Sequence, residues 1–356
     1  MRYFGKGKRQ VLVVGEAPGA EEDEEGKPFV GRAGQFLRET LDSIGFDLDE
    51  DAWSTNALIC HPTGGILPKV LDKSIPYCRP NLRTTIATLK PRVVVVMGKA
   101  ATTSLLPKYW QSDIGTMERW TGWRIPTKDH WIVPTYHPTF LLRMENSLMN
   151  RAFTADLKRA FTITKEARAF EMDAEISLLY EPEEIMRAIE ELLESEWVAF
   201  DYEGNCLKPE YAGARLYSCA MSNGERTISF PLLKQLRPML LRFFASKVKK
   251  IASNAKFEER WTRHTFGMGV RNWGWDTMLA AHCLDNRPGI CSLKFQSFVR
   301  MGVPTYNEHI EPFLRSGNDH INRIHQIKLP DLLYYGGMDA LLEYRLAMVQ
   351  RKDFGL

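Results

Sequence analysis

Four acidic side chains in the second half of the chain have the types and spacing that divalent cations require. Asp201 and Glu203 stand two residues apart at the end of an apolar strand, so both point to one face of it. Glu258 lies in the first turn of a predicted helix, and Asp339 follows Tyr335 by four residues. Alone, the first pair is more typical of an ordinary strand end. Together, the four acids predict phosphodiester hydrolysis by two metal ions, which needs converging carboxylates.

A second group of candidate residues follows buried strands in the first half of the chain. The segment Gly15–Gly19 could bring backbone N–H groups close to a phosphate, or could simply be a tight connection. Phe29 lies in a second glycine-rich turn, Asn56 ends another strand, and His137 follows a third. Because parallel α/β sheets bind ligands at the carboxyl ends of their strands, we predict a binding site there. The acidic run 21–25 is expected to be a solvated loop.

The elements that must position these groups form two different α/β domains. Apolar runs at 11–14 and 93–97 each end in glycine and lead into a helical pattern, which is typical of buried parallel strands. The pattern then weakens into a mixed-charge connector, and a new unit begins with a proline-led amphipathic helix. We therefore predict a first domain at 1–168, a linker at 169–180 and a second domain at 181–356.

Composition and length fit this division and argue against a membrane protein. The 356 residues exceed what one hydrophobic core usually serves, and 44% hydrophobic with 26% charged residues is ordinary for globular proteins. A net charge of +3 leaves nucleic-acid binding open, because a local basic face is enough. No apolar run is long enough for a membrane span or a signal peptide. We expect a cytoplasmic protein without a membrane partner.

The acidic segments, in their order along the chain, resemble the DEDD exonuclease superfamily, and specifically the proofreading domain of family A DNA polymerases. The resemblance covers residues 181–350 and implies an RNase H-like α/β domain with a mixed sheet. It also implies two Mg²⁺ or Mn²⁺ ions, held by Asp201, Glu203, Glu258 and Asp339. Tyr335, which marks the tyrosine branch of the superfamily, would orient the attacking water. Asn254 and Lys256 would support the site or contact the DNA strand.

The first half resembles the family 4 uracil-DNA glycosylases over residues 8–161. This resemblance implies a three-layer α/β/α fold with a parallel sheet, and a pocket that takes an extruded uracil. Phe29 would stack on the base, and Asn56 would pair with its edge, since an amide offers both a donor and an acceptor. Glu16 would act on water or stabilise the sugar cation, and His137 would supply a proton or hydrogen bond to the departing uracil.

The same resemblance implies contacts with the DNA around the flipped nucleotide. Gly15 and Gly19 would approach a phosphate through the backbone. Leu142 would fill the vacated stack, and Arg143 would grip a phosphate.

Two departures from the resembled families bear on activity. The third acid of the exonuclease motif is usually Asp, and here it is Glu258, so we expect an active site with altered metal preference. Cys60 and Cys78 match only the later two of four cysteines that hold a 4Fe–4S cluster in the glycosylases, and the chain begins at Met1 without the earlier pair. Either the domain folds without a cluster or the natural start lies upstream, so we expect no cluster in this chain.

A glycosylase-like domain followed by a proofreading domain resembles the amino-terminal portion of phage-type family A DNA polymerases. We predict a metal-dependent 3′–5′ DNA exonuclease with an attached uracil-DNA glycosylase-like domain, in a bacterial or phage-infected cell. One alternative is a replisome accessory or split-polymerase subunit whose first half only binds DNA or a polymerase. Another is trimming of RNA 3′ ends. The expected partners are single-stranded or frayed 3′ ends, uracil-containing DNA, and a polymerase domain or subunit.

Overall fold

The computed structural model describes residues 2–62, 68–171, 175–316 and 320–356, which fall into two compact units. The first unit comprises Met1–Phe170 and Phe298–Thr305, and the second comprises Glu171–Ser297 and Tyr306–Leu356. In the described residues, no helix combines the length and the apolar composition that crossing a bilayer would need.

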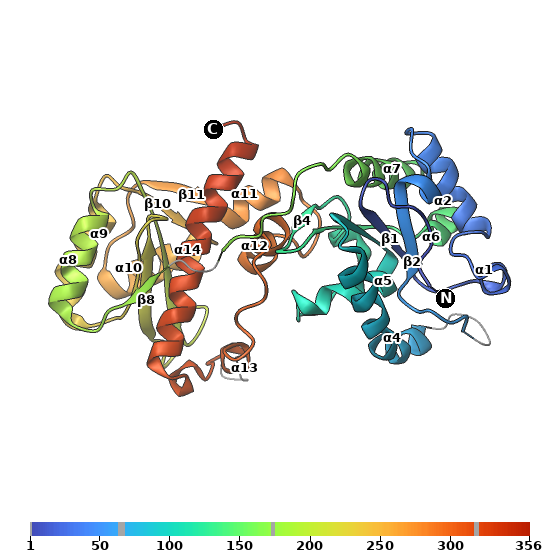
Figure 1. Cartoon of the computed structure of the whole chain (residues 1–356). Helices are drawn as coiled ribbons and strands as arrows, with labels where there is room; N and C mark the ends of the chain where they lie inside the picture. Colours follow the sequence, from blue (N-terminus) through green and yellow to red (C-terminus); the bar gives the residue numbers. More distant parts are fainter. Residues whose placement is uncertain (1, 63–67, 172–174, 317–319) are drawn as a thin grey trace. The chain divides into compact units, whose positions relative to one another are not determined.

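A five-stranded sheet in the order β2-β1-β3-β5-β4 forms the centre of the first unit (Figure 1). Four of its strands run parallel, and they are β1 (Val11–Gly15), β2 (Ala52–Asn56), β3 (Val93–Met97) and β5 (Trp131–Thr135). The short edge strand β4 (Ile125–Pro126) pairs antiparallel with β5. The valine runs of β1 and β3 are completely buried, as continuous β-branched runs predict for a sheet covered on both faces.

Helices cover both faces of this sheet and make the first unit a three-layer α/β/α structure. Helices α2 (Arg32–Asp42) and α7 (Ser147–Phe161) pack with alternate residues of the central strands in one core. Helices α4 (Pro68–Leu89) and α5 (Gly98–Leu105) pack against each other on the other side of the sheet (Figure 1).

The second unit is built on a six-stranded mixed sheet in the order β11-β10-β7-β8-β9-β6. Its longer strands are β7 (Trp197–Gly204), β8 (Leu216–Ser222), β9 (Thr227–Pro231), β10 (Lys249–Ala252) and β11 (Trp273–Asp276). Strands β7, β8 and β9 alternate in direction, whereas β10 runs parallel to β7 and β11. The mixed sheet predicted from the exonuclease resemblance is thus confirmed.

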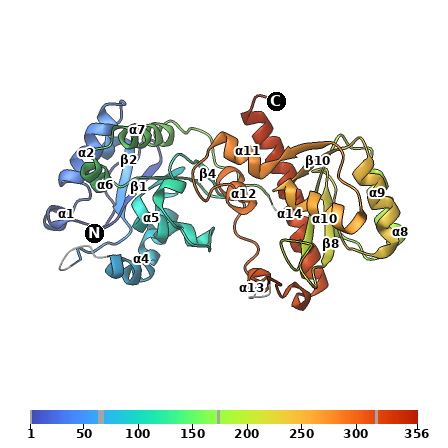
Figure 2. The ribbon, with the colours of Figure 1, turned by 180° about the vertical axis from the view of Figure 1, so that it is seen from behind.

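One long helix, α14 (Leu329–Asp353), packs across β7, β8 and β9 on one face of this sheet (Figure 2). The other face carries α8 (Pro182–Leu192), α9 (Arg237–Ala245) and α10 (Ala255–Phe266), whose apolar side chains surround Phe200. The remaining α-helices of the described residues are α1 (Ala20–Glu25), α3 (Leu48–Asp51), α6 (Pro138–Met144), α11 (Thr277–Leu284), α12 (Leu293–Met301) and α13 (Glu311–Leu314).

Two segments differ from the predicted domain boundaries. The predicted linker 169–180 contains the strand β6 (Ile176–Leu178), which pairs in parallel with β9; three residues are too few for a detectable periodicity. Residues 172–174 of that linker lie outside the described residues. Residues 298–305, predicted within the second domain, belong to the first unit, because the Phe298 ring stacks on Trp110 with centroids 5.6 Å apart.

Candidate active sites

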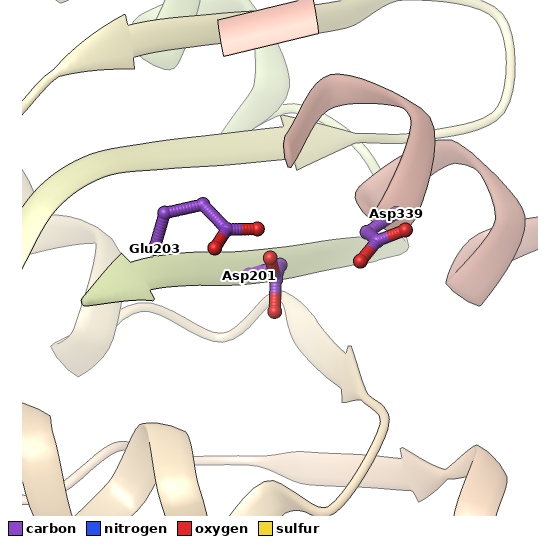
Figure 3. A group of neighbouring side chains, drawn as sticks. All are labelled: Asp201, Glu203 and Asp339. Atoms are coloured by element: carbon purple, nitrogen blue, oxygen red, sulfur yellow. The ribbon is translucent and has the colours of Figure 1, made fainter. Parts of the chain in front are cut away.

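Three carboxylates of the second unit converge where β7 and α14 meet. Asp201 and Glu203 project from the same face of β7, and Asp339 approaches them from α14 (Figure 3). Oxygens of the three side chains all lie within 4.8 Å of one another. This spacing suits a shared divalent cation, so the structure brings together three of the four acids predicted as metal ligands.

The glycine pair that precedes Asp339 explains how α14 comes so close to the sheet. A Cβ on Gly337 would lie 2.4 Å from Ile176 Cγ2, closer than real side chains approach. A Cβ on Gly336 would lie only 3.4 Å from Glu203 Cγ. Because neither residue has a side chain, the helix backbone rests directly on the strands and Asp339 reaches the acids of β7.

Burial and like-charge repulsion dominate the electrostatics of this cluster. Burial, followed by the charge on Asp339, raises the pKa of Asp201 to about 8, while Lys294 acts to lower it. Burial, Asp201 and Asp339 together raise the pKa of Glu203 well above its ordinary value. Carboxylates this close to one another ionise together only when positive charge compensates them.

Glu258, the fourth predicted acid, is buried beside this trio rather than within it. The residue stands in the first turn of α10 and is 1% exposed, and its Oε2 has no hydrogen-bond partner among the described residues. Burial and then the charge on Asp201 raise its pKa well above the ordinary value. A buried carboxylate oxygen without a partner is costly, and a second bound cation would supply one.

The two predicted DNA-contacting residues of this unit precede Glu258 at the start of α10. Asn254 adopts a left-handed φ of 73° as the N-cap of α10. The N–H groups of Asn254 and Ala255 donate to the Asp276 carboxylate at 3.1 and 2.9 Å, which fixes this turn. Lys256 is exposed and, with Asp276, lines a shallow pocket. Their contacts with DNA remain predictions.

Three residues near the acids were not predicted from the sequence. Lys294, on α12, forms an ion pair with Asp339, and its Nζ donates to Tyr335 Oη at 2.8 Å. Tyr306 Oη donates to the other oxygen of Asp339. Glu343 is buried one helical turn after Asp339, and that four-residue spacing could have revealed it. Lys294 and Tyr306 lie in no motif, so only the fold places them here.

The donor set fits Mg²⁺ or Mn²⁺. The predicted ligands offer only carboxylate oxygens, which hard divalent cations prefer. The unpartnered Oε2 of Glu258 leaves one of these oxygens free for a cation. The Lys294 ammonium group, paired with Asp339, shows that the cluster attracts positive charge.

In the first unit, a cavity of about 940 Å³ opens at the carboxyl ends of the parallel strands. Six residues predicted from the glycosylase resemblance line it, and they are Glu16, Gly19, Phe29, Asn56, His137 and Arg143. Leu142 is half-buried on α6 and is not among the lining residues of this cavity. Gly15 lies behind the lining, in contact with two of its members.

Phe29 and Asn56 both pack against Gly15 and are almost completely buried. A Cβ on Gly15 would lie 2.4 Å from Asn56 Oδ1 and 2.7 Å from Phe29 Cζ. Phe29 has a left-handed φ of 60°, an uncommon conformation for an aromatic residue that often marks functional sites. An aromatic ring and an amide held side by side can stack on a planar base and pair with its edge.

His137 is a neutral hydrogen-bond donor in the same cavity. The backbone N–H of Thr139 donates to His137 Nδ1 at 3.3 Å, which leaves the ring proton on Nε2. Burial and then Arg143 lower the pKa of the His137 imidazole to about 4. Burial raises the pKa of Glu16, and Arg143 acts to lower it. Near neutral pH, His137 therefore presents an N–H group rather than an acidic imidazolium.

The acidic run 21–25, predicted to be a loop, forms helix α1. Glu22 caps it by accepting the Gly19 N–H at 3.0 Å, and its other oxygen accepts the Gly31 N–H at 2.9 Å. This one-sided cap, in which the third helical residue accepts the N–H of the N-cap glycine, stabilises the turn and explains why the run is helical. A DNA phosphate would have to compete with Glu22 for the N–H of Gly19, the predicted phosphate contact.

The two cysteines of the first unit lie apart from any metal site in the part of the chain that the structure describes. Cys60 is exposed and Cys78 is half-buried on α4, and neither belongs to a group of three potential metal ligands. The other four cysteines, at 206, 219, 283 and 291, belong to the second unit. Two thiolates do not complete a four-cysteine cluster site.

Comparison with known proteins separates the two halves of the chain. Residues 2–161 match the uracil DNA glycosylase superfamily, and residues 176–348 match a family described as 3′-5′ exonuclease. The type-4 uracil-DNA glycosylase of Saccharolobus solfataricus is 32% identical over 166 residues, which are 46% of this chain and 73% of that protein. The type-4 enzyme of Pyrobaculum aerophilum is 35% identical over 142 residues, 39% of this chain and 71% of that protein.

Solved structures resemble the chain more distantly. The catalytic core of RRP6 from Trypanosoma brucei has a TM-score of 0.40 at 18% identity, and the match covers 53% of this chain and 49% of that protein. Brucella melitensis NrnC with bound Mg²⁺ has a TM-score of 0.39 at 17% identity, covering 50% of this chain and 79% of that one. Similarity at this level says nothing about substrate.

Proposed function

The chain belongs to the type-4 uracil-DNA glycosylase family through residues 2–161, and we propose that this first unit excises uracil from DNA. Residues 176–348 form a 3′-5′ exonuclease domain, so the chain is an enzyme. We further propose that this second domain removes nucleotides from DNA 3′ ends in a two-metal, proofreading type of reaction. The observation that carries the exonuclease proposal is the convergence of Asp201, Glu203 and Asp339 within 4.8 Å.

For uracil excision, the residues that line the cavity of the first unit supply the functions that the chemistry needs. Phe29 stacks on the flipped base, and the Asn56 amide pairs with the N3–H donor and an adjacent carbonyl acceptor of the uracil edge. The Nε2–H of His137 donates to a uracil oxygen as negative charge develops on the leaving base. Glu16 faces the sugar, where its carboxylate stabilises the cation or orients the attacking water. Arg143, exposed on α6, contacts a phosphate.

For the exonuclease, the chain supplies the ligands and positions the nucleophile. Asp201, Glu203, Asp339 and Glu258 would hold two Mg²⁺ or Mn²⁺ ions. When bound, such ions polarise the scissile phosphate and make water a stronger nucleophile. Tyr335 stays a neutral phenol because burial and the charge on Asp339 raise its pKa well above the ordinary value. Since its oxygen accepts from Lys294, the phenol proton is free to donate to the attacking water.

The combination of domains suggests a role at replicating DNA. We propose that the chain acts with a family A DNA polymerase domain or subunit, as in the phage-type polymerases that its two halves resemble in order. Its setting would be the cytoplasm of a bacterial or phage-infected cell. With two cysteines in the first unit, we propose that the chain's own residues hold no 4Fe–4S cluster, and that excision proceeds without one.

A single preparation can test both activities. A 5′-labelled single strand containing one uracil is incubated with Mg²⁺ or with EDTA, and abasic sites and 3′ shortening are measured separately. We expect EDTA to abolish shortening and to leave uracil release intact, because base excision uses no metal here. Matched DNA and RNA strands without uracil show which nucleic acid the exonuclease prefers.

Two variants serve as controls for each other. Asp201→Ala with Glu203→Ala should lose 3′ shortening and keep uracil release, and Asn56→Ala should do the reverse. Full 3′ shortening by the double variant would refute the exonuclease site. Absence of abasic sites with the unmodified chain would instead favour a first unit that only binds DNA or a polymerase.

A further inference from the structure

Glu343 is a buried acid that the proposed reaction does not use. It lies on α14, one helical turn after Asp339, and is 1% exposed. Its Oε1 accepts the N–H of Ser253 at 3.0 Å, while its Oε2 has no hydrogen-bond partner among the described residues. Half of this carboxylate is therefore satisfied by the backbone, and the other half is buried without compensation.

Glu343 shares this property with Glu258 and is electrostatically linked to it. Both side chains are 1% exposed, and each has a buried Oε2 without a partner. Ser253, to which Glu343 bonds, stands at the connection from β10 to α10 that carries Glu258. Burial raises the pKa of Glu343 well above its ordinary value, and Asp201, Glu258 and Asp339 raise it further. The two oxygens without a hydrogen-bond partner therefore belong to acids that repel one another electrostatically.

The charges of these acids can be balanced against those of two bound divalent cations and Lys294. Asp201, Glu203, Glu258, Asp339 and Glu343 carry five negative charges when ionised. Two divalent cations supply four positive charges, and the ammonium group of Lys294, paired with Asp339, supplies the fifth. A site with four acids would be neutral with the two ions alone, so the additional acid and the lysine compensate each other.

We propose that Glu343 is a fifth carboxylate of the metal centre, which holds the second divalent cation together with Glu258, and that Lys294 balances the added charge. The proposal rests on the proposed two-metal function of this domain. It accounts for both unpartnered oxygens, which lie outside the trio of Asp201, Glu203 and Asp339.

A structural role is the competing explanation, because Glu343 also ties α14 to the backbone at Ser253. Glu343→Gln separates the two roles, since glutamine keeps a carbonyl oxygen for the Ser253 N–H but carries no charge. Mn²⁺ binding to the full chain is counted by electron paramagnetic resonance, and the melting temperature of the second unit is recorded with and without Mn²⁺. Glu184→Gln, an exposed acid on α8, is the matched control.

We expect Glu343→Gln to weaken the second Mn²⁺ by at least about tenfold. It should also reduce the gain in melting temperature that Mn²⁺ produces, because the variant lacks one of the carboxylates whose charge the cation compensates. Glu184→Gln should match the unmodified chain. Adding Lys294→Met to Glu343→Gln removes one positive and one negative charge together, so this double variant should recover part of the lost affinity for the second Mn²⁺. Lys294→Met alone, in contrast, leaves one negative charge of the five acids uncompensated.

Two Mn²⁺ ions bound by Glu343→Gln with affinity within about twofold of the unmodified chain would overturn the proposal. Failure of the two-metal function itself gives a different result. In that case Asp201→Ala with Glu203→Ala would retain Mn²⁺ binding and 3′ shortening, whatever Glu343→Gln does.

Discussion

Gly15 and Asn56 are in direct contact, because a Cβ on Gly15 would lie 2.4 Å from Asn56 Oδ1. Gly15 ends β1 and Asn56 ends the neighbouring strand β2, where the two are register partners. The absence of a side chain at Gly15 is thus what allows the buried amide to sit at the floor of the cavity. The resemblance assigned Gly15 to a phosphate, and the structure gives it a steric reason as well.

We predict that Gly15→Ala lowers uracil excision at least about tenfold, or about 1.4 kcal/mol of transition-state stabilisation. The new methyl group must displace the Asn56 amide or the Phe29 ring, since an atom of each would lie less than 3 Å from the added Cβ. Overpacking of this kind also costs about 1–3 kcal/mol of folding stability, visible as a lower melting temperature of the first unit. Exonuclease activity of the same preparation is the internal control, and unchanged excision would show that the pocket can relax around a methyl group.

The protonation state of His137 gives a prediction on pH. With a pKa of about 4 the imidazole is neutral at pH 5 and above, so it donates through Nε2–H across the whole neutral range. We expect the single-turnover rate of uracil release to show no fall centred near pH 6.5, the ordinary histidine pKa. A fall there that disappears in His137→Asn would mean that an imidazolium supplies the proton.

Glu258→Asp restores the residue that the resembled exonucleases carry. The side chain is buried, and shortening it keeps the charge while moving its unpartnered oxygen. We predict that Glu258→Asp shortens 3′ ends at a rate within about tenfold of that of the unmodified chain. When Mg²⁺ is the added metal, its rate should equal or exceed that of the unmodified chain. Glu258→Gln, which keeps the length but removes the charge, should lose more than tenfold. A larger loss for Asp than for Gln would show that the surrounding residues are adapted to the longer acid.

The sequence predicted most of the strands, and the acids that converge at β7, because local signals coincide there. The buried valine runs specify β1 and β3, and the spacing of Asp201 and Glu203 places both on one face of β7. Strand β6 was missed because three residues carry no measurable periodicity. Phe298 was assigned to the wrong unit because its stacking on Trp110 joins residues 188 positions apart, which no local pattern records.

The missed site residues were missed for a similar reason. Lys294 and Tyr306 reach Asp339 only through the fold, from segments that contain no recognisable motif. Glu343, in contrast, shares a helix face with Asp339, and its spacing alone could have suggested a role. Glu22 was expected in a solvated loop, yet its side chain completes a cap on Gly19 and so turns the acidic run into a helix.

The acids of the exonuclease site predict how the stability of the metal-free protein depends on pH. Asp201 has a folded-state pKa of about 8 against an ordinary value of 3.8, and burial also raises the pKa values of Glu203 and Glu258. Between those values the folded state binds more protons than the unfolded state. The contribution of these groups to the free energy of unfolding is therefore fully present below their unfolded-state pKa values. It is lost as the pH rises through their folded-state pKa values.

In EDTA, we expect the melting temperature of the second unit to fall steadily as pH rises from about 5 to about 8. Mg²⁺ or Mn²⁺ should remove or reverse this fall, because bound cations stabilise the ionised acids and favour the folded state by mass action. Asp201→Asn with Glu203→Gln removes two of the titrating groups, so its melting temperature should depend less on pH and respond less to metal. A melting temperature in EDTA that stays constant or rises over this range would mean that these carboxylates are ionised and compensated without metal, and the charge balance drawn between Lys294 and the five acids would then be wrong.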